Sequence, residues 1–157
     1  MTEPPTVQFV VEPADSPPSL ELQSAFFADI AGRYPGWEPG ASSRADPSDF
    51  TAPDGLWLVA YLDGRPAGCG GVQRVGEEKA EIRRVYLDAG ARGRGLGRML
   101  MTELEDHSRR LGYARVRLTT GDRQPEALGL FRSLGYDAVE PFSAGVFTRH
   151  WLEKPLG

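Results

Sequence analysis

One segment constrains the fold more than any other: Asp88-Ala89-Gly90-Ala91-Arg92-Gly93-Arg94-Gly95-Leu96-Gly97. Residues 80–87 before it alternate between apolar and polar side chains, as in a β-strand. Residues 96–111 after it place their apolar side chains on one face of a helix. Four glycines within residues 90–97 permit positive φ angles and a close approach of the backbone to a ligand. We therefore expect a strand, a Gly-rich loop and an amphipathic helix in succession.

The Gly-rich loop is expected to bind an anion. The first backbone N–H groups of a helix have no partner inside it, and the helix dipole places positive potential at the same point. Arg92, Arg94 and Arg98 add positive charge around it. Phosphate is the ligand that these features favour. An isolated Gly-rich stretch is, however, equally consistent with a flexible Arg-Gly turn.

Two common phosphate-binding loops do not match. No Gly-Lys-Ser/Thr follows the glycines, so hydrolysis of a magnesium nucleotide by a P-loop loses its support. Gly93, Gly95 and Gly97 lack the two-residue gap of the Rossmann fingerprint. They also follow a meander of strands that are joined closely enough to be antiparallel.

The rest of the pattern predicts a mixed α/β fold. A helix between the strands at 80–87 and 114–119 makes those two strands parallel. Residues 36–55 are expected to form a long loop, and Trp57 is expected in the core. The expected strands are 7–11, 56–62, 65–72, 80–87, 114–119, 137–140 and 146–152, and the expected helices are 20–30, 96–111 and 124–134.

Composition bounds the remaining possibilities. At 157 residues, the chain is expected to form a single domain over residues 1–157. A net charge of -4 argues against nonspecific binding to nucleic acid. No apolar run approaches the roughly 18 residues of a membrane span. Residues 1–5 have no feature of a secretory signal, so a cytoplasmic location is expected.

The cysteine and the histidines indicate no chemistry of their own. Cys69 is the single cysteine, which rules out an internal disulfide, and it is expected to be a small core residue and not a nucleophile. His107 and His150 share no metal-ligand spacing, so no metal site is expected.

The Gly-rich loop resembles the coenzyme loop of the GNAT superfamily of N-acetyltransferases, which reads Gln/Arg-x-x-Gly-x-Gly/Ala. Arg92, Gly95 and Gly97 match that pattern. The resemblance includes the strand at 81–87, the helix residues 125–131 and the pair Gly135-Tyr136, and it covers roughly residues 56–140. It implies a GNAT-like α/β (α+β) fold, with a mixed, mostly antiparallel central sheet, flanking helices and a splayed central strand pair.

The resemblance also implies acetyl-CoA (coenzyme A) as the cofactor. Backbone amides around residues 92–98 would bind its pyrophosphate, and the backbone at 85–87 would pair with its pantetheine arm, as a peptide adds to a sheet edge. The candidate cofactor-binding residues are Val85, Tyr86, Leu87, Arg92, Gly93, Arg94, Gly95, Leu96, Gly97, Arg98, Gln124 and Phe131.

Glu81 is the candidate catalytic residue. It lies eleven residues before Arg92, the spacing at which several GNAT enzymes place a general-base glutamate. A carboxylate there could take a proton from the amine through water. The alternative, to which we give equal weight, is a solvated strand carboxylate that pairs with Arg83.

Two positions near the last helix bear on the reaction. Phe131 stands where many members of the family have a tyrosine that protonates the departing thiolate, and phenylalanine cannot donate a proton. Gln124, where the family often has asparagine, could bond the cofactor or the start of the helix.

The implied function is transfer of acetyl to a primary amine of a small molecule or peptide, with no nucleic acid or membrane partner. The acceptor pocket would border the segment after the first helix; its candidates are Trp37, Glu38, Asp46, Asp49 and Phe50. More often, such aromatic residues anchor loops and such acids are solvated. The alternatives are a noncatalytic acyl-CoA-binding or sensor module, which Phe131 favours, and a nucleotide-binding α/β protein. The oligomeric state stays open, a homodimer included.

Overall fold

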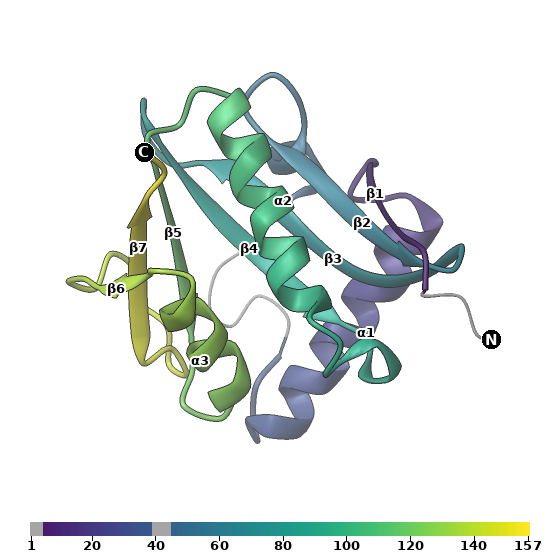
Figure 1. Ribbon diagram of the computed structural model, residues 1–157. Coiled ribbons are helices and arrows are strands. Elements are labelled where there is room, and N and C mark those ends of the chain that lie inside the picture. Colours follow the sequence, from purple (N-terminus) through teal and green to yellow (C-terminus); the bar gives the residue numbers. More distant parts are fainter. Residues whose placement is uncertain (1–4, 39–44) are drawn as a thin grey trace.

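A computed structural model describes residues 5–38 and 45–157 (Figure 1). Its described strands form a seven-stranded sheet in the order β1-β2-β3-β4-β5-β7-β6. The strands are β1 Val7–Val11, β2 Leu56–Leu62, β3 Arg65–Arg74, β4 Lys79–Leu87, β5 Arg115–Thr120, β6 Asp137–Ala138 and β7 His150–Pro155. The α-helices are α1 Pro17–Arg33, α2 Leu96–Arg110 and α3 Pro125–Ser133.

The pairing of the strands confirms the expected mixed sheet. β1 to β4 form an antiparallel meander, β4 and β5 are parallel, and β7 runs antiparallel to both β5 and β6. The parallel ladder between β4 and β5 is short. It begins at Lys79↔Arg115 and ends at Glu81↔Arg117. Beyond that pair the two strands separate, which confirms the splayed central pair (Figure 1).

Two apolar layers cover opposite faces of the sheet. α2 packs on one face through Leu100, Met101 and Leu104, which are fully buried against residues of β2 to β5. α1 lies behind the sheet in Figure 1, where Leu22 packs in a second cluster with Trp57. Trp57 is in the core as expected.

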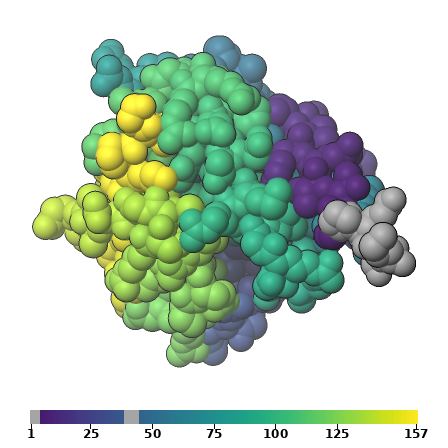
Figure 2. Space-filling view, viewed as in Figure 1, coloured from purple at the N-terminus to yellow at the C-terminus, as the bar shows by residue number. Residues whose placement is uncertain are grey.

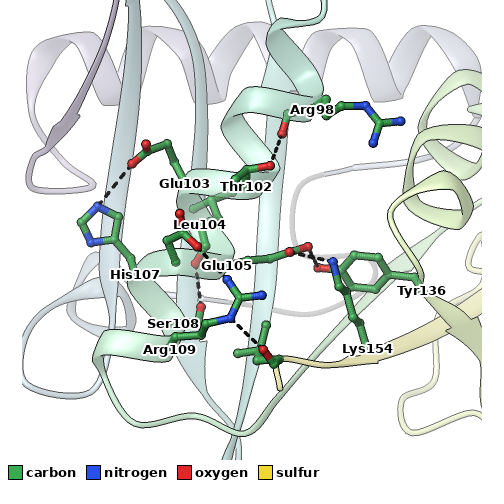
Figure 3. A network of polar contacts seen from close by, with 12 residues as sticks. Arg98, Thr102, Glu103, Leu104, Glu105, His107, Ser108, Arg109, Tyr136 and Lys154 are labelled. Atoms are coloured by element: carbon green, nitrogen blue, oxygen red, sulfur yellow. Dashed lines mark hydrogen bonds and ion pairs between the residues drawn. The ribbon is translucent and has the colours of Figure 1, made fainter.

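Glu105 links α2 to the C-terminal strands by a buried polar network (Figure 3). Its carboxylate accepts a hydrogen bond from the Tyr136 hydroxyl and one from the Lys154 ammonium, each at 2.8 Å. The ammonium also lies 5.6 Å from the centre of the Tyr136 ring. Burial and the Glu105 charge raise the pKa of Tyr136. Loss of either partner would leave a buried charge unpaired, so the network fixes the position of β7 against α2.

The expected boundaries were wrong in the last part of the chain. β6 is only two residues long, and β7 begins at His150 instead of 146. Val146 is 70% exposed, so its apolar side chain marks no strand there. The expected loop at 36–55 contains a 3-10 turn at Pro47–Phe50, and its residues 39–44 lie outside the described part. No helix in residues 5–38 and 45–157 has the length and apolar character needed to span a membrane.

Candidate functional site

The loop before α2 presents a row of backbone N–H groups. Gly93 and Gly95 both have φ of +77°, a conformation that side-chain-bearing residues rarely adopt. Gly95 caps α2 and offers no side chain to its first amides. The hydrogen bonds between described residues include none donated by the backbone N–H groups of residues 93–98. These unpaired donors at a helix N-terminus fit a phosphate.

Gly97 serves a different purpose from the two glycines before it. A β-carbon there would lie 3.2 Å from Leu130 Cδ2 and 3.3 Å from Leu87 Cδ1. Its missing side chain therefore lets the first turn of α2 approach both α3 and the end of β4. Leu96, beside it, is 3% exposed and anchors the helix start in the core.

The three loop arginines are not equivalent. Arg92 donates from Nε to the carbonyl of Leu87 at 3.0 Å and lies over the Tyr86 ring. Arg98 donates to the Ser133 hydroxyl at 2.7 Å, which ties α2 to α3. Arg94 is exposed and bonds to none of the described residues. Its guanidinium is therefore available to bind a ligand.

The end of β4 has an unpaired side that faces the gap. The Asp88 N–H bonds to β3 at 2.8 Å, and successive residues of a strand face opposite ways. The backbone of Val85 and Leu87 therefore faces the opening between β4 and β5, whereas that of Tyr86 faces β3. The Leu87 carbonyl already accepts the bond from Arg92.

A cavity of about 180 Å³ lies between α1, β4, β5 and α3. Figure 2 shows a hollow between the teal residues of the loop and the green residues of α3, with α1 visible behind it. Its charged lining residues are Glu81, Arg83 and Arg84, and most of its aromatic lining comes from α1 and the segment that follows it. The aromatic lining residues are Phe26, Phe27, Tyr34, Trp37, Phe131 and Phe147.

Glu81 lies at the closed end of the gap, where β4 and β5 still pair. Its carboxylate accepts from Arg117 Nε at 2.9 Å and lies 3.4 Å from Arg83 Nε. Its side chain is only 14% exposed. The expected pairing with Arg83 is therefore present, but the carboxylate is shielded instead of solvated and has a second guanidinium partner.

Phe131 and Gln124 both line the cavity. Phe131 is 6% exposed and packs against the Tyr136 ring. The side chain of Gln124 caps no amide of α3, so of its two suggested roles the bond to the helix start is absent. Its Oε1 instead accepts a bond from the Tyr34 hydroxyl at 3.2 Å. Burial raises the pKa of Tyr34, so this phenol stays protonated at neutral pH.

The acceptor-side candidates separate in the structure. Trp37 lines the cavity and contacts the Phe27 ring. Phe50 is 1% exposed and packs on Trp57, so it is a loop anchor. Glu38 is exposed, and Asp46 and Asp49 form a capping box in the 3-10 turn.

Sequence reasoning missed three residues of the site: Tyr34, Arg84 and Arg117. Tyr34 and Arg84 line the cavity, and Arg117 holds Glu81. Arg84 had one available signal, because two adjacent arginines inside an alternating strand break the alternation. Tyr34 and Arg117 follow no pattern that would distinguish them.

The histidines lie apart. His107 lies 3.9 Å from Glu103 on α2, and His150 lies 2.7 Å from Asp122. Within the described part of the chain, no group of three or more His, Cys, Asp or Glu side chains is arranged to hold a metal ion.

Known proteins resemble this chain in sequence or in fold. The model of the acetyltransferase (GNAT) family matches residues 21–136. An IAA acetyltransferase of Azospirillum brasilense is 33% identical over 116 residues, which are 71% of this chain and 74% of that protein. The N-alpha-acetyltransferase RimI of Mycobacterium tuberculosis is 32% identical over 142 residues, 88% of this chain and 82% of its own. A PaiA N-acetyltransferase of Thermoplasma acidophilum, solved in complex with coenzyme A, has the same fold. Its TM-score is 0.71 at 15% identity, over 96% of this chain and 99% of that one.

Proposed function

The chain belongs to the acetyltransferase (GNAT) family, and on that premise we propose that it transfers acetyl from acetyl-CoA directly to a primary amine. The reaction needs no covalent enzyme intermediate. The acceptors of the two relatives differ by name, so neither is assigned to this chain. Membership of an acetyltransferase family does not favour the noncatalytic alternative.

One observation carries the proposal: the phosphate-binding loop and the unpaired side of β4 meet. The N–H groups of residues 93–98 would hold the pyrophosphate of the coenzyme. Backbone groups of Val85 would pair with the amides of the pantetheine arm, as a strand would. The Leu87 carbonyl could also pair with the pantetheine arm after its hydrogen bond with Arg92 breaks. An arm that follows β4 from the loop leads toward Glu81 and the cavity.

When bound, acetyl-CoA supplies a thioester carbonyl as the electrophile. The acceptor must lose a proton, because a primary amine has a reference pKa of about 10.4 and is mostly charged at neutral pH. A carboxylate has about four lone-pair positions for hydrogen bonds. Arg117 and Arg83 contact one oxygen each, so Glu81 keeps lone pairs that can accept from a water or from the ammonium group. We propose Glu81 as the general base on this ground.

The departing thiolate cannot be protonated by Phe131. Four hydroxyl groups line the same cavity, those of Tyr34, Thr119, Thr120 and Thr148. Tyr34 is the candidate donor among them, because two hydrogen bonds fix the position of its hydroxyl. The hydroxyl donates to Gln124 Oε1 and accepts from the Arg123 N–H at 3.0 Å. A thiol of reference pKa about 8.5 also leaves tolerably without a donor, so the donor is not essential.

Calorimetric titration with acetyl-CoA tests the coenzyme part, with NAD and ATP as controls. Selective binding of acetyl-CoA is expected, and an amine panel assayed by thiol release then tests the transfer. Absence of acetyl-CoA binding by folded protein would contradict the proposal. Selective binding of NAD would point to a nucleotide-binding protein, and tight acetyl-CoA binding without any turnover to a sensor module.

A further inference from the structure

Arg84 occupies an unusual backbone position. Cys69 pairs with Tyr86 and Gly71 with Arg83, so β4 carries one extra residue opposite Gly70. Arg84 has φ of +56° at this β-bulge. A left-handed conformation costs a residue with a side chain about 1–2 kcal/mol, and such strain clusters at functional sites. The bulge turns Arg84 toward α1 and into the lining of the cavity.

The guanidinium of Arg84 is held firmly but by neutral partners. It donates to Gln23 Oε1 at 2.6 Å and to the Ala45 carbonyl at 3.2 Å. Gln23 is itself fixed, because its Nε2 donates to Ala14 and Ser19 carbonyls. The rings of Phe27 and Phe50 lie 5.2 Å and 5.8 Å from the guanidinium carbon. Burial, together with the nearby Arg83 charge, lowers the pKa of Arg84.

No carboxylate among the described residues forms an ion pair with Arg84. Asp49, on the adjoining turn, accepts instead from the Asp46 backbone at 2.8 Å. A partly buried charge without a counter-ion is unfavourable unless a ligand supplies one. Bonds to the described residues use two of the five guanidinium N–H groups. The three that remain can bind a planar anion.

The charges of the cavity lining indicate a monoanion. The charged lining side chains are Glu81, Arg83 and Arg84, a formal sum of one positive charge. Glu81 is already paired with Arg83 and with Arg117, which adds a second positive charge beside the lining. Arg84 is the lining arginine with which no described carboxylate pairs. Around Arg84 the wall is apolar and aromatic, with Phe27 and Trp37 in contact at 5.8 Å between ring centres. A positive, aromatic cavity thus lies in a chain whose net charge is -4.

We propose that Arg84 binds a carboxylate of the acceptor, so that the substrates are primary amines that also carry a carboxylate and an apolar or aromatic body. This inference rests on the proposed acetyl transfer for its meaning. The carboxylate completes the ion pair that Arg84 lacks, and the aromatic wall covers the apolar body. The amine is then directed toward Glu81, which lines the same cavity. Arg84 is a specificity-determining residue in this scheme.

Binding without turnover provides the first test. Protein saturated with coenzyme A is titrated with 3-phenylpropionate and with its uncharged analogue 3-phenylpropanamide. The carboxylate is expected to bind about tenfold more tightly or better, as a charge-assisted bond predicts. Equal affinity of the two probes for the wild-type protein would overturn the proposal, whatever any variant does.

Variants then assign the preference to Arg84. Arg84→Met should abolish it, Arg84→Lys should keep part of it, and the matched control Arg110→Met, exposed at the end of α2, should leave it intact. Arg84→Gln serves if the Met variant fails to fold, which thermal melts followed by circular dichroism would reveal. A preference that survives in a folded variant without the charge would also refute the assignment.

Turnover separates this inference from the proposed function. The kcat/KM for L-phenylalanine should exceed that for L-phenylalaninamide, in the same direction as the affinities of the two probes. Acetylation of both amines at equal kcat/KM would contradict the carboxylate site at Arg84 and support the proposed acetyl transfer. A carboxylate preference in binding, with no acetylation of any amine, would sink the proposed function and keep the anion site.

Discussion

Glu81 and Arg117 form the last registered pair between β4 and β5, and their side chains form an ion pair of 2.9 Å where the strands separate. This pair closes the gap at one end, while the unpaired N–H groups of the Gly-rich loop lie at the other. Glu81 is therefore both the candidate base and part of the ion pair that joins the two strands. Its replacement can lower the rate by removing the base or lower the stability by removing the ion pair, and the two effects can be measured separately.

Replacement of Glu81 by glutamine distinguishes these two roles. If Glu81 is the base, the rate should fall by roughly 100-fold or more. The loss should be largest at mildly acidic pH, where the acceptor is most fully protonated. The measurement is a pH–rate profile of kcat/KM with a thermal melt at each pH. An unaltered profile shape, with a lower melting temperature, would leave Glu81 only the structural role.

Substitution of the loop glycines should weaken binding of acetyl-CoA. Gly95→Val forces a side chain into φ of +77°, and Gly97→Val drives one into Leu130 and Leu87. Both would distort the amides that we propose bind the pyrophosphate, so we expect at least a tenfold loss of affinity, measured by calorimetry. Gly129→Val is the matched control, because nothing lies within 4 Å of its β-carbon position. Unchanged affinity in the loop variants would defeat the phosphate assignment.

Glu153 should contribute stability that acid removes. Burial alone would raise its pKa, but hydrogen bonds from Arg115 at 2.6 Å and Lys79 at 3.1 Å outweigh it and leave the pKa below its usual range. A depressed pKa stabilises the fold above the unfolded-state value of about 4.3, and the contribution disappears as pH falls through the folded value.

Glu153→Gln should therefore destabilise the protein by about 1–3 kcal/mol at pH 7 and by much less near pH 3. Urea unfolding at both pH values measures the difference. Glu140→Gln, at an exposed position, is the control and should change little. An equal loss at pH 7 and pH 3 would show that the charge of Glu153 is not responsible.

Cys69 should be inert in the native protein. Its side chain is fully buried, and burial raises the pKa of the thiol to about 12. Since the thiolate is the reactive form, iodoacetamide at pH 8 should label Cys69 only after unfolding in denaturant. Mass spectrometry of native and denatured samples checks this. Rapid labelling of the native protein would contradict the burial.

Much of the fold was predictable because its local signals were strong. The meander from Leu56 to Leu87, the helix α2 and the parallel crossover are confirmed, and so is the family inferred from Arg92, Gly95 and Gly97. The core positions of Trp57 and Cys69 are confirmed as well. The C-terminal strands were misplaced because Val146 is apolar but exposed, and a single exposed valine cannot be recognised from periodicity.

Only half of the candidate site could be predicted from the sequence. Its proposed coenzyme side is built from backbone and glycine, and the sequence shows these glycines at Gly93 and Gly95. Its proposed acceptor side depends on a bulge that turns Arg84 toward α1 and on a tyrosine at the end of that helix. The orientation of Arg84 and the position of the tyrosine depend on how strands pair and helices pack in the folded chain. Alternation along one strand does not encode this.

The separation of β4 and β5 has one further effect. Unpaired strand edges commonly recruit strands of other molecules and so promote aggregation. Here the two unpaired edges face each other inside the protein, flanked by α1 and α3. These backbone groups are therefore less open to strands of other molecules than the groups at the outer edges of the sheet.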